Sequence, residues 1–185
     1  MPTQSESVKV SSPSENPTCQ SNCEYPALVS EHFVMCQSQL NSSDGVSHLL
    51  SETWNSAILD CGATKTVAGN EWFNNFYNSL PECEKSKVNY EKYTSIFRFG
   101  DGERVASDRN VKIPTIIGKK SVTISVDLID KDVPLLLSRE SMKNAKMELN
   151  FVNDKAKIFG EEVKLKLTNS GHYIIPLYRT CQSNE

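Results

Sequence analysis

The sequence lacks any long apolar run. No stretch of its 185 residues approaches the roughly 20 consecutive apolar residues that span a bilayer. The opening residues, MPTQSESVKVSSPSENP, contain no apolar core of the kind found in a secretory signal. Without such a signal, the 6 cysteines are expected to be reduced thiols rather than a disulfide framework. The sequence therefore predicts an intracellular (cytoplasmic) protein that has no membrane partner.

An excess of positive charge is also missing. The chain carries 20 Lys and Arg residues against 23 Asp and Glu residues, which gives a formal net charge of −3. A protein with this balance has no overall basic field, so direct nucleic-acid binding is not expected. Several lysines alternate with apolar residues and are expected on a solvated face of a sheet. They are Lys119, Lys120, Lys155, Lys157, Lys164 and Lys166.

Apolar residues are few, at 38% of the chain, which indicates that part of the chain does not pack into a core. The first 18 or so residues are mostly Ser, Pro, Glu, Gln and Asn, a composition typical of disorder. We therefore expect a disordered lead-in and linker at 1–48, one folded domain at 50–178 and a tail at 179–185. No internal repeat is visible.

Within the expected domain, the alternation of Trp54, Ser56 and Ile58 with the residues between them predicts a mostly buried strand that runs into Asp60. A short helix is predicted near 70–80, where core residues recur at helical spacing. These residues are Trp72, Phe73, Phe76, Tyr77 and Leu80. A second short helix is predicted in SRESMKNAK, with Ser138 as its N-cap and lysines toward its end.

The remaining apolar residues predict many short strands. Phe97 and Phe99 alternate across Arg98, and Gly100-Asp101-Gly102 then favours a hairpin turn, because an Asp-Gly pair accepts positive φ angles. Separate strands are predicted to begin at Val111 and near Val122, followed by a buried run at 133–137 and alternating segments up to Leu177. Many short strands with two short helices predict an all-β, closed barrel-like domain.

The stretch ILDCGAT, residues 58–64, places a carboxylate at the end of an apolar strand. An Asp-x-Gly tripeptide alone is typical of an ordinary turn, since Asp and Gly are common turn residues. Here, however, small residues follow instead of a second strand. A glycine-flanked hairpin and then an apolar triplet leading into a short helix come later in the chain.

In this order, the motifs resemble a retropepsin-type aspartic protease from the Pol polyprotein of an LTR retrotransposon. ILDCGAT is similar to the catalytic motif of that family, FRFGDGERV to its flap hairpin, and PLLLSRESM to its third element, which enters a short helix. The resemblance covers Trp54 to Leu177. It implies an acid-protease fold that forms one half of a bilobal homodimer.

The resemblance also implies roles for particular residues. Asp60 is the expected catalytic carboxylate, paired with Asp60 of an identical chain, and the substrate is an extended peptide within a retroelement polyprotein. No metal and no cofactor are implied. The residues expected to support the active-site loop are Cys61, Gly62, Ala63 and Thr64. The expected flap and substrate-binding residues are Phe99, Gly100, Asp101, Gly102 and Glu103.

Two positions depart from the family pattern. Cys61 stands where the family has Ser or Thr, and Ser138 stands where the family has glycine. A thiol is a poor hydrogen-bond donor, so the contact that ties the two active-site loops together across the dimer should be weaker. A second hypothesis follows from these departures, in which the chain is a catalytically impaired dimerisation or peptide-binding module.

Other chemistries fit the sequence less well. Cys61 as a nucleophile would need a neighbouring base, and His32, His48 and His172 are scattered along the chain. A zinc site with loose spacing remains an alternative to plain surface thiols at Cys19, Cys23, His32 and Cys36. The other aspartates of the domain are expected at turns or strand ends, without a catalytic role. They include Asp101, Asp108, Asp127, Asp130 and Asp132.

Overall fold

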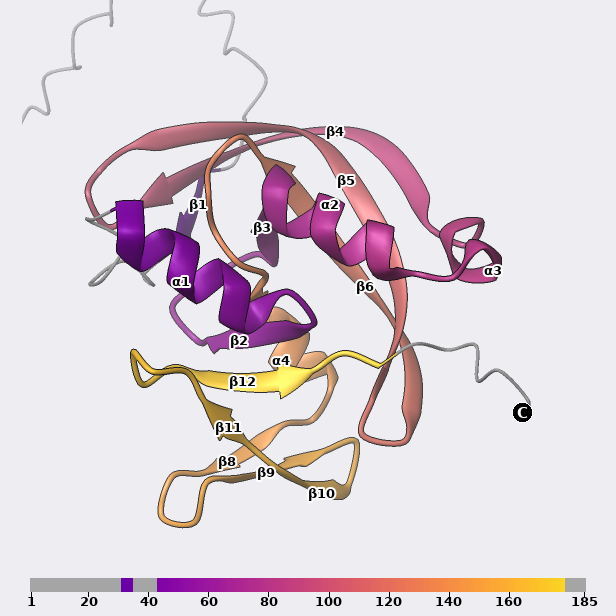
Figure 1. Cartoon of the computed structure of the whole chain (residues 1–185). Coiled ribbons are helices and arrows are strands. Elements are labelled where there is room, and N and C mark those ends of the chain that lie inside the picture. Colours follow the sequence, from indigo (N-terminus) through magenta and orange to yellow (C-terminus); the bar gives the residue numbers. More distant parts are fainter. Residues whose placement is uncertain (1–30, 35–42, 179–185) are drawn as a thin grey trace, which may run out of the picture.

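The computed structural model describes residues 31–34 and 43–178, which are mostly β-structure (Figure 1). The helices in these ranges are α1 (Ser43–Thr53), α2 (Asn70–Ser79), α3 (Glu82–Lys85) and α4 (Arg139–Asn144). The strands are β1 (Glu31–Val34), β2 (Ser56–Asp60), β3 (Val67–Gly69), β4 (Asn89–Phe99), β5 (Arg104–Ile117), β6 (Lys120–Ile129), β7 (Leu136–Ser138), β8 (Glu148–Asn150), β9 (Lys155–Ile158), β10 (Glu161–Lys164), β11 (Lys166–Leu167) and β12 (Tyr173–Pro176). Among the described residues, no helix is both long and apolar enough to cross a membrane.

Most strands form one mixed sheet of 9 strands, in the order β1-β4-β5-β6-β3-β7-β2-β12-β11. A separate sheet has the order β10-β9-β8, and Figure 1 shows it below the long β4–β5 hairpin, with β2 and β12 between them. The prediction of a mostly β domain is confirmed. The predicted closed barrel is wrong for the described residues, because β1 and β11 each pair with one neighbour and leave the sheet open.

The helices also differ from the prediction. The predicted helix near 70–80 is α2, and its aromatic residues are core: Trp72 and Phe76 are buried and stack with ring centroids 5.2 Å apart. Helix α1 lies across the predicted boundary between lead-in and domain. It runs to Thr53, so β2 begins only at Ser56. Trp54, which was predicted to belong to this strand, lies outside it with 39% of its surface exposed.

The β4–β5 hairpin has its turn where the sequence predicts it, between Phe99 and Arg104. Val111 does not begin a separate strand, however, because β5 continues through it and through Pro114, which pairs with Thr123 of β6. The hairpin therefore consists of two long strands, and β5 also supplies the pairing edge for β6.

Strand β2 lies inside the large sheet, parallel to β7 and antiparallel to β12. Its last residue, Asp60, is in register with Ser138, the last residue of β7. The two motifs that the resemblance singles out therefore end side by side, although they are far apart in the sequence. Beneath them, Ile58 belongs to a buried cluster that also contains Leu49 of α1 and Phe97 of β4.

Candidate active site

Asp60 is held in a fixed orientation by the turn that follows β2. Only 8% of its surface is exposed. Its Oδ1 atom accepts hydrogen bonds from the backbone N–H groups of Gly62 at 2.9 Å and Ala63 at 3.2 Å. The Ala63 N–H also lies 3.1 Å from the Asp60 carbonyl oxygen, which it bonds. The turn thus folds around the carboxylate and orients it.

The rest of the predicted loop is hydrogen-bonded to α4 at Ala63 and is exposed to solvent at Cys61. The N–H of Arg139, the first residue of α4, donates to the Ala63 carbonyl at 3.0 Å. Ala63 is buried, Gly62 and Thr64 are half-buried, and Cys61 is exposed as a free thiol. The structure therefore brings the predicted loop residues together and leaves Cys61 facing solvent at the tip of the turn.

Ser138 is the N-cap of α4, as predicted, with its Oγ accepting from the Ser141 N–H at 3.3 Å. The helix begins at Arg139, directly after it. The Ser138 hydroxyl also accepts a hydrogen bond from Thr66 Oγ1 at 3.1 Å. Thr66 Oγ1 in turn accepts one from the Ser138 N–H at 3.1 Å. Ser141 Oγ lies 2.8 Å from the same Thr66 oxygen. The Ser138 side chain, which stands where the family pattern has glycine, is thus part of a hydroxyl cluster, Thr66–Ser138–Ser141, in which Thr66 and Ser138 are buried.

Thr66 is a site residue that the sequence does not reveal. We expect Thr66→Val, which keeps the shape and removes the hydroxyl, to lower the free energy of unfolding by about 1–3 kcal/mol, because the buried Ser138 N–H loses its acceptor. Urea denaturation measures the change. Thr94→Val, at an exposed position of β4, should leave stability nearly unchanged. Equal stability of the two variants would contradict a supporting role for the Thr66 hydroxyl.

Asp127 lies beside this cluster, and its predicted placement at a turn or strand end is wrong. It lies inside β6 with 1% of its surface exposed. Its carboxylate accepts from Asn110 Nδ2 at 2.6 Å and from Ser95 Oγ at 3.0 Å, and it pairs with Lys65 Nζ at 3.0 Å. Its backbone N–H donates to the Thr66 carbonyl at 3.0 Å. Asp127 therefore anchors the segment that leads away from the Asp60 turn. Asp108 likewise lies within β5 rather than at its end.

Lys65 links Asp127 to the exposed ring of Tyr93, whose centroid lies 3.9 Å from the Lys65 Nζ. Burial lowers the pKa of Lys65, but hydrogen bonds to Tyr93 and Asp127 and attraction to both groups outweigh it, so that the pKa lies above its ordinary value of 10.5. The folded state therefore holds this proton more tightly than the unfolded chain does.

A raised pKa gives Lys65 a stabilising effect that depends on pH. The effect is complete below pH 10.5 and is lost as the pH rises through the pKa of the folded state. We expect the wild type to be more stable than Lys65→Met at pH 8, and the difference to shrink above pH 10.5. Urea denaturation at pH 8 to 12, with exposed Lys164→Met as the control, tests this. A difference that stays constant up to pH 12 would contradict the raised pKa.

The predicted flap residues lie at the tip of the β4–β5 hairpin. Phe99 is 3% exposed and packs into the cluster around Ile58, whereas Gly100 to Glu103 are exposed. Lys131, from the loop after β6, fastens the tip: its Nζ lies 4.4 Å from the Phe99 ring centroid, 3.4 Å from Asp101 Oδ2, and pairs with Glu103. Lys131 is a second residue that sequence reasoning missed.

Metal and thiol chemistry receive no support from the described residues. In these ranges, no group of three or more His, Cys, Asp and Glu side chains could hold a metal ion. Cys19, Cys23, Cys36 and the side chain of His32 lie outside the described part, so the zinc site stays a prediction. His48 contacts Glu52 at 3.1 Å and His172 contacts Ser170 at 2.8 Å, and neither contact involves Cys61.

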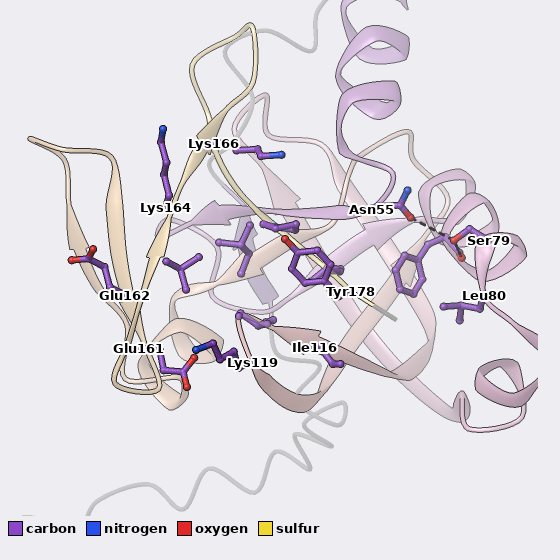
Figure 2. A pocket seen from close by; sticks show the side chains of 17 residues that line it. Asn55, Ser79, Leu80, Ile116, Lys119, Glu161, Glu162, Lys164, Lys166 and Tyr178 are labelled. Carbon is purple, nitrogen blue, oxygen red and sulfur yellow. Dashed lines mark hydrogen bonds between the residues drawn. The ribbon is translucent and has the colours of Figure 1, made fainter. Parts of the chain in front are cut away.

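A cavity that is lined by described residues lies away from Asp60. It has a volume of ≈ 860 Å³, and its lining includes no residue of the Asp60 turn or of the hairpin tip. Figure 2 shows lysine and glutamate side chains at one end and Asn55 with Ser79, 3.5 Å apart, at the other. A smaller polar cavity of ≈ 370 Å³ is lined by Lys65, Thr66, Asp127 and Ser138 among others. Cavity size therefore does not mark the candidate site, which is identified by the chemistry around Asp60.

The described geometry thus holds one oriented carboxylate, supported by the hydroxyl cluster and by Asp127, under a long hairpin. Compared with protein-family models, the chain matches none, and compared with curated proteins it again matches none. The relation to retropepsins is therefore a resemblance in the order of motifs.

Proposed function

We propose that the chain is an aspartic endopeptidase that acts as a homodimer and processes a retroelement polyprotein. The observation that carries the proposal is the setting of Asp60. It ends an interior strand, only 8% of its surface is exposed, and two backbone N–H groups orient its Oδ1 atom. Such a carboxylate is positioned for chemistry on a molecule that approaches the open side of the turn.

The proposed reaction is the hydrolysis of a peptide bond by water. One carboxylate takes a proton from the attacking water, and a second, protonated carboxyl group polarises the scissile carbonyl; a proton then passes to the leaving nitrogen. Two carboxyl groups at close range divide these tasks because like charges disfavour ionisation of both, so that the pair shares one proton. Each chain supplies Asp60, and a symmetric dimer supplies the pair.

The exposed position of Cys61 supports a dimer in which the two turns meet. Cys61 follows Asp60 directly and faces solvent in the single chain. In the proposed dimer, this side chain lies at the two-fold axis and contacts the turn of the partner. The β4–β5 hairpin, whose tip is fastened by Lys131, covers the bound peptide and reduces the access of water.

Cleavage of a proteome-derived peptide library by the full chain, followed by mass spectrometry, tests the proposed activity. We expect cleavage at acid to neutral pH that pepstatin, an inhibitor of aspartic proteases, abolishes. Cleavage that pepstatin leaves unchanged would contradict the proposal.

A better donor at position 61 should strengthen the dimer. We expect Cys61→Ser to lower the dimer dissociation constant about 5- to 10-fold, because a hydroxyl gains roughly 1 kcal/mol over a thiol in hydrogen bonding. Sedimentation equilibrium measures the constant, with Cys83→Ser, which also replaces an exposed thiol, as the matched control. An equal effect of both substitutions would contradict a dimer contact at Cys61.

A second candidate function is that of a dimerising or peptide-binding module without catalysis. It is favoured by the thiol at Cys61, a poorer hydrogen-bond donor than the Ser or Thr of the retropepsin pattern, while the Thr66–Ser138–Ser141 cluster keeps the fold of the loop. A pure dimer that binds library peptides and cleaves none of them would support this function over the first.

A further inference from the structure

One edge of the β4–β5 hairpin is covered by a segment that lies far from the hairpin in the sequence. Strand β4 pairs with β5 on one side. On its other side, Ile96–Phe99 pair in parallel with Glu31–Val34, the residues of β1 (Figure 1). Residues 89–94 of β4 are exposed and are not paired with β1. The covered part of the edge is therefore the half of β4 next to the hairpin tip.

This half of β4 lies over the strand that carries Asp60. Phe97 and Phe99 are buried in one cluster with Ile58 of β2 and Leu49 of α1, and Ile58 precedes Asp60 by two positions. The segment that pairs with Ile96–Phe99 thus lies along the hairpin close to the proposed active site.

An uncovered strand edge offers a row of N–H and C=O groups that pairs readily with another extended chain. Such strand addition derives its affinity mainly from backbone hydrogen bonds, so it tolerates many side-chain sequences. Strand β1 is 4 residues long, which limits its pairing to a few bonds. Because β1 belongs to the same chain, its effective concentration at the edge is of millimolar order. An external peptide therefore displaces it only when that peptide binds more tightly or is present at comparable concentration.

We propose that Ile96–Phe99 is a strand-addition site for extended peptides, and that Glu31–Val34 occupies it in cis and competes with other peptides. The proposed peptide-binding site does not depend on the proposed endopeptidase function. Its consequence for cleavage, namely that β1 slows the turnover of external substrates, rests on the proposed endopeptidase function.

Hydrogen exchange of the β4 amides tests the site without relying on catalysis. All chains carry Asp60→Asn, so that no bound peptide is cleaved. One variant combines His32→Pro and Phe33→Pro. Adjacent N–H groups of a strand point to opposite sides, and proline has no N–H. The two prolines therefore remove at least one N–H that faces β4. The matched control combines His32→Ala and Phe33→Ala, which keeps both N–H groups.

We expect amide exchange within 96–99 to accelerate on the order of tenfold in the proline variant and little in the alanine control, because the edge opens to solvent. A synthetic peptide of residues 28–35 at millimolar concentration should restore the protection. Unchanged exchange in the proline variant, equal acceleration in the alanine control, or failure of the peptide to protect would overturn the site. Protection that disappears on dilution would show that a second copy, not the same chain, supplies the strand, and would overturn occupation in cis.

In the background with Asp60 intact, we expect the proline variant to cleave a library peptide faster than the alanine control does. If the two variants cleave at equal rates while amide exchange within 96–99 is faster in the proline variant, the binding site stands. Only the proposal that β1 slows the cleavage of external peptides would then be overturned. Absence of cleavage in every variant would count against the endopeptidase function and leave the exchange result to decide the binding site.

Discussion

Asp60→Asn is expected to lower the rate of peptide cleavage by roughly 10³-fold or more, with little change in the fold. The asparagine side chain keeps an oxygen that accepts from the Gly62 and Ala63 N–H groups, so the turn retains its shape. Its amide group cannot take a proton from water at neutral pH. In a homodimer the substitution removes both carboxylates at once, so the loss should be close to complete.

The measurement is the cleavage rate of one library peptide by both chains, with circular dichroism to compare their folds. The matched control is Asp108→Asn, whose side chain is 93% exposed and lies on β5. This control should keep the wild-type rate. Equal cleavage by the wild type and Asp60→Asn would remove Asp60 from the reaction and, with it, the aspartic endopeptidase function.

Asp127→Ala is expected to lower the free energy of unfolding by about 2–4 kcal/mol, because removal of the buried carboxylate leaves its hydrogen-bond donors without an acceptor. The substitution removes the acceptor of Ser95, which is fully buried, and of Asn110. It also removes the ion pair with Lys65, which is partly exposed and regains water, so most of the cost comes from the two hydrogen bonds that Ser95 and Asn110 donate to the carboxylate.

Urea denaturation measures this effect, and Asp130→Ala is the matched control. Asp130 has the same charge, is exposed and follows β6 directly. Its removal should change the stability by no more than about 0.5 kcal/mol. A similar small change for Asp127→Ala would show that the network around it does not hold the fold together.

Local patterns were sufficient to predict the elements that build the candidate site. The apolar stretch before Asp60 is β2, the helical spacing of Trp72 and Phe76 is α2, and the hairpin turn lies at Gly100 to Gly102. The N-cap at Ser138 was also predicted, because a Ser at the end of an apolar run satisfies the first N–H groups of a helix.

Residues that act through long-range contacts could not be predicted in this way. Asp127 alternates with Val126 and Leu128, so the pattern places it on the polar side of its strand. That side is covered by Lys65, a residue 62 positions away, and no local rule gives this pairing. The parallel pairing of β1 with β4 has the same origin. A four-residue strand is too short to carry a periodic signal, and its place is determined by the edge of a strand that lies far along the chain.

Of the predicted fold class, only the mostly β part is confirmed. A closed barrel is absent from the described residues because β1 and β11 end the large sheet without meeting. The proposed pairing of two Asp60 turns requires a second chain, so the motif order in one chain cannot test it.

The most direct test is therefore a crystal structure of the dimer that the purified protein forms in solution. It measures the distance between the two Asp60 carboxylates. The endopeptidase function predicts that the carboxylates of both chains lie within roughly 2.6–3.2 Å of one shared water. Two Asp60 side chains too far apart for one water to bridge them would contradict it.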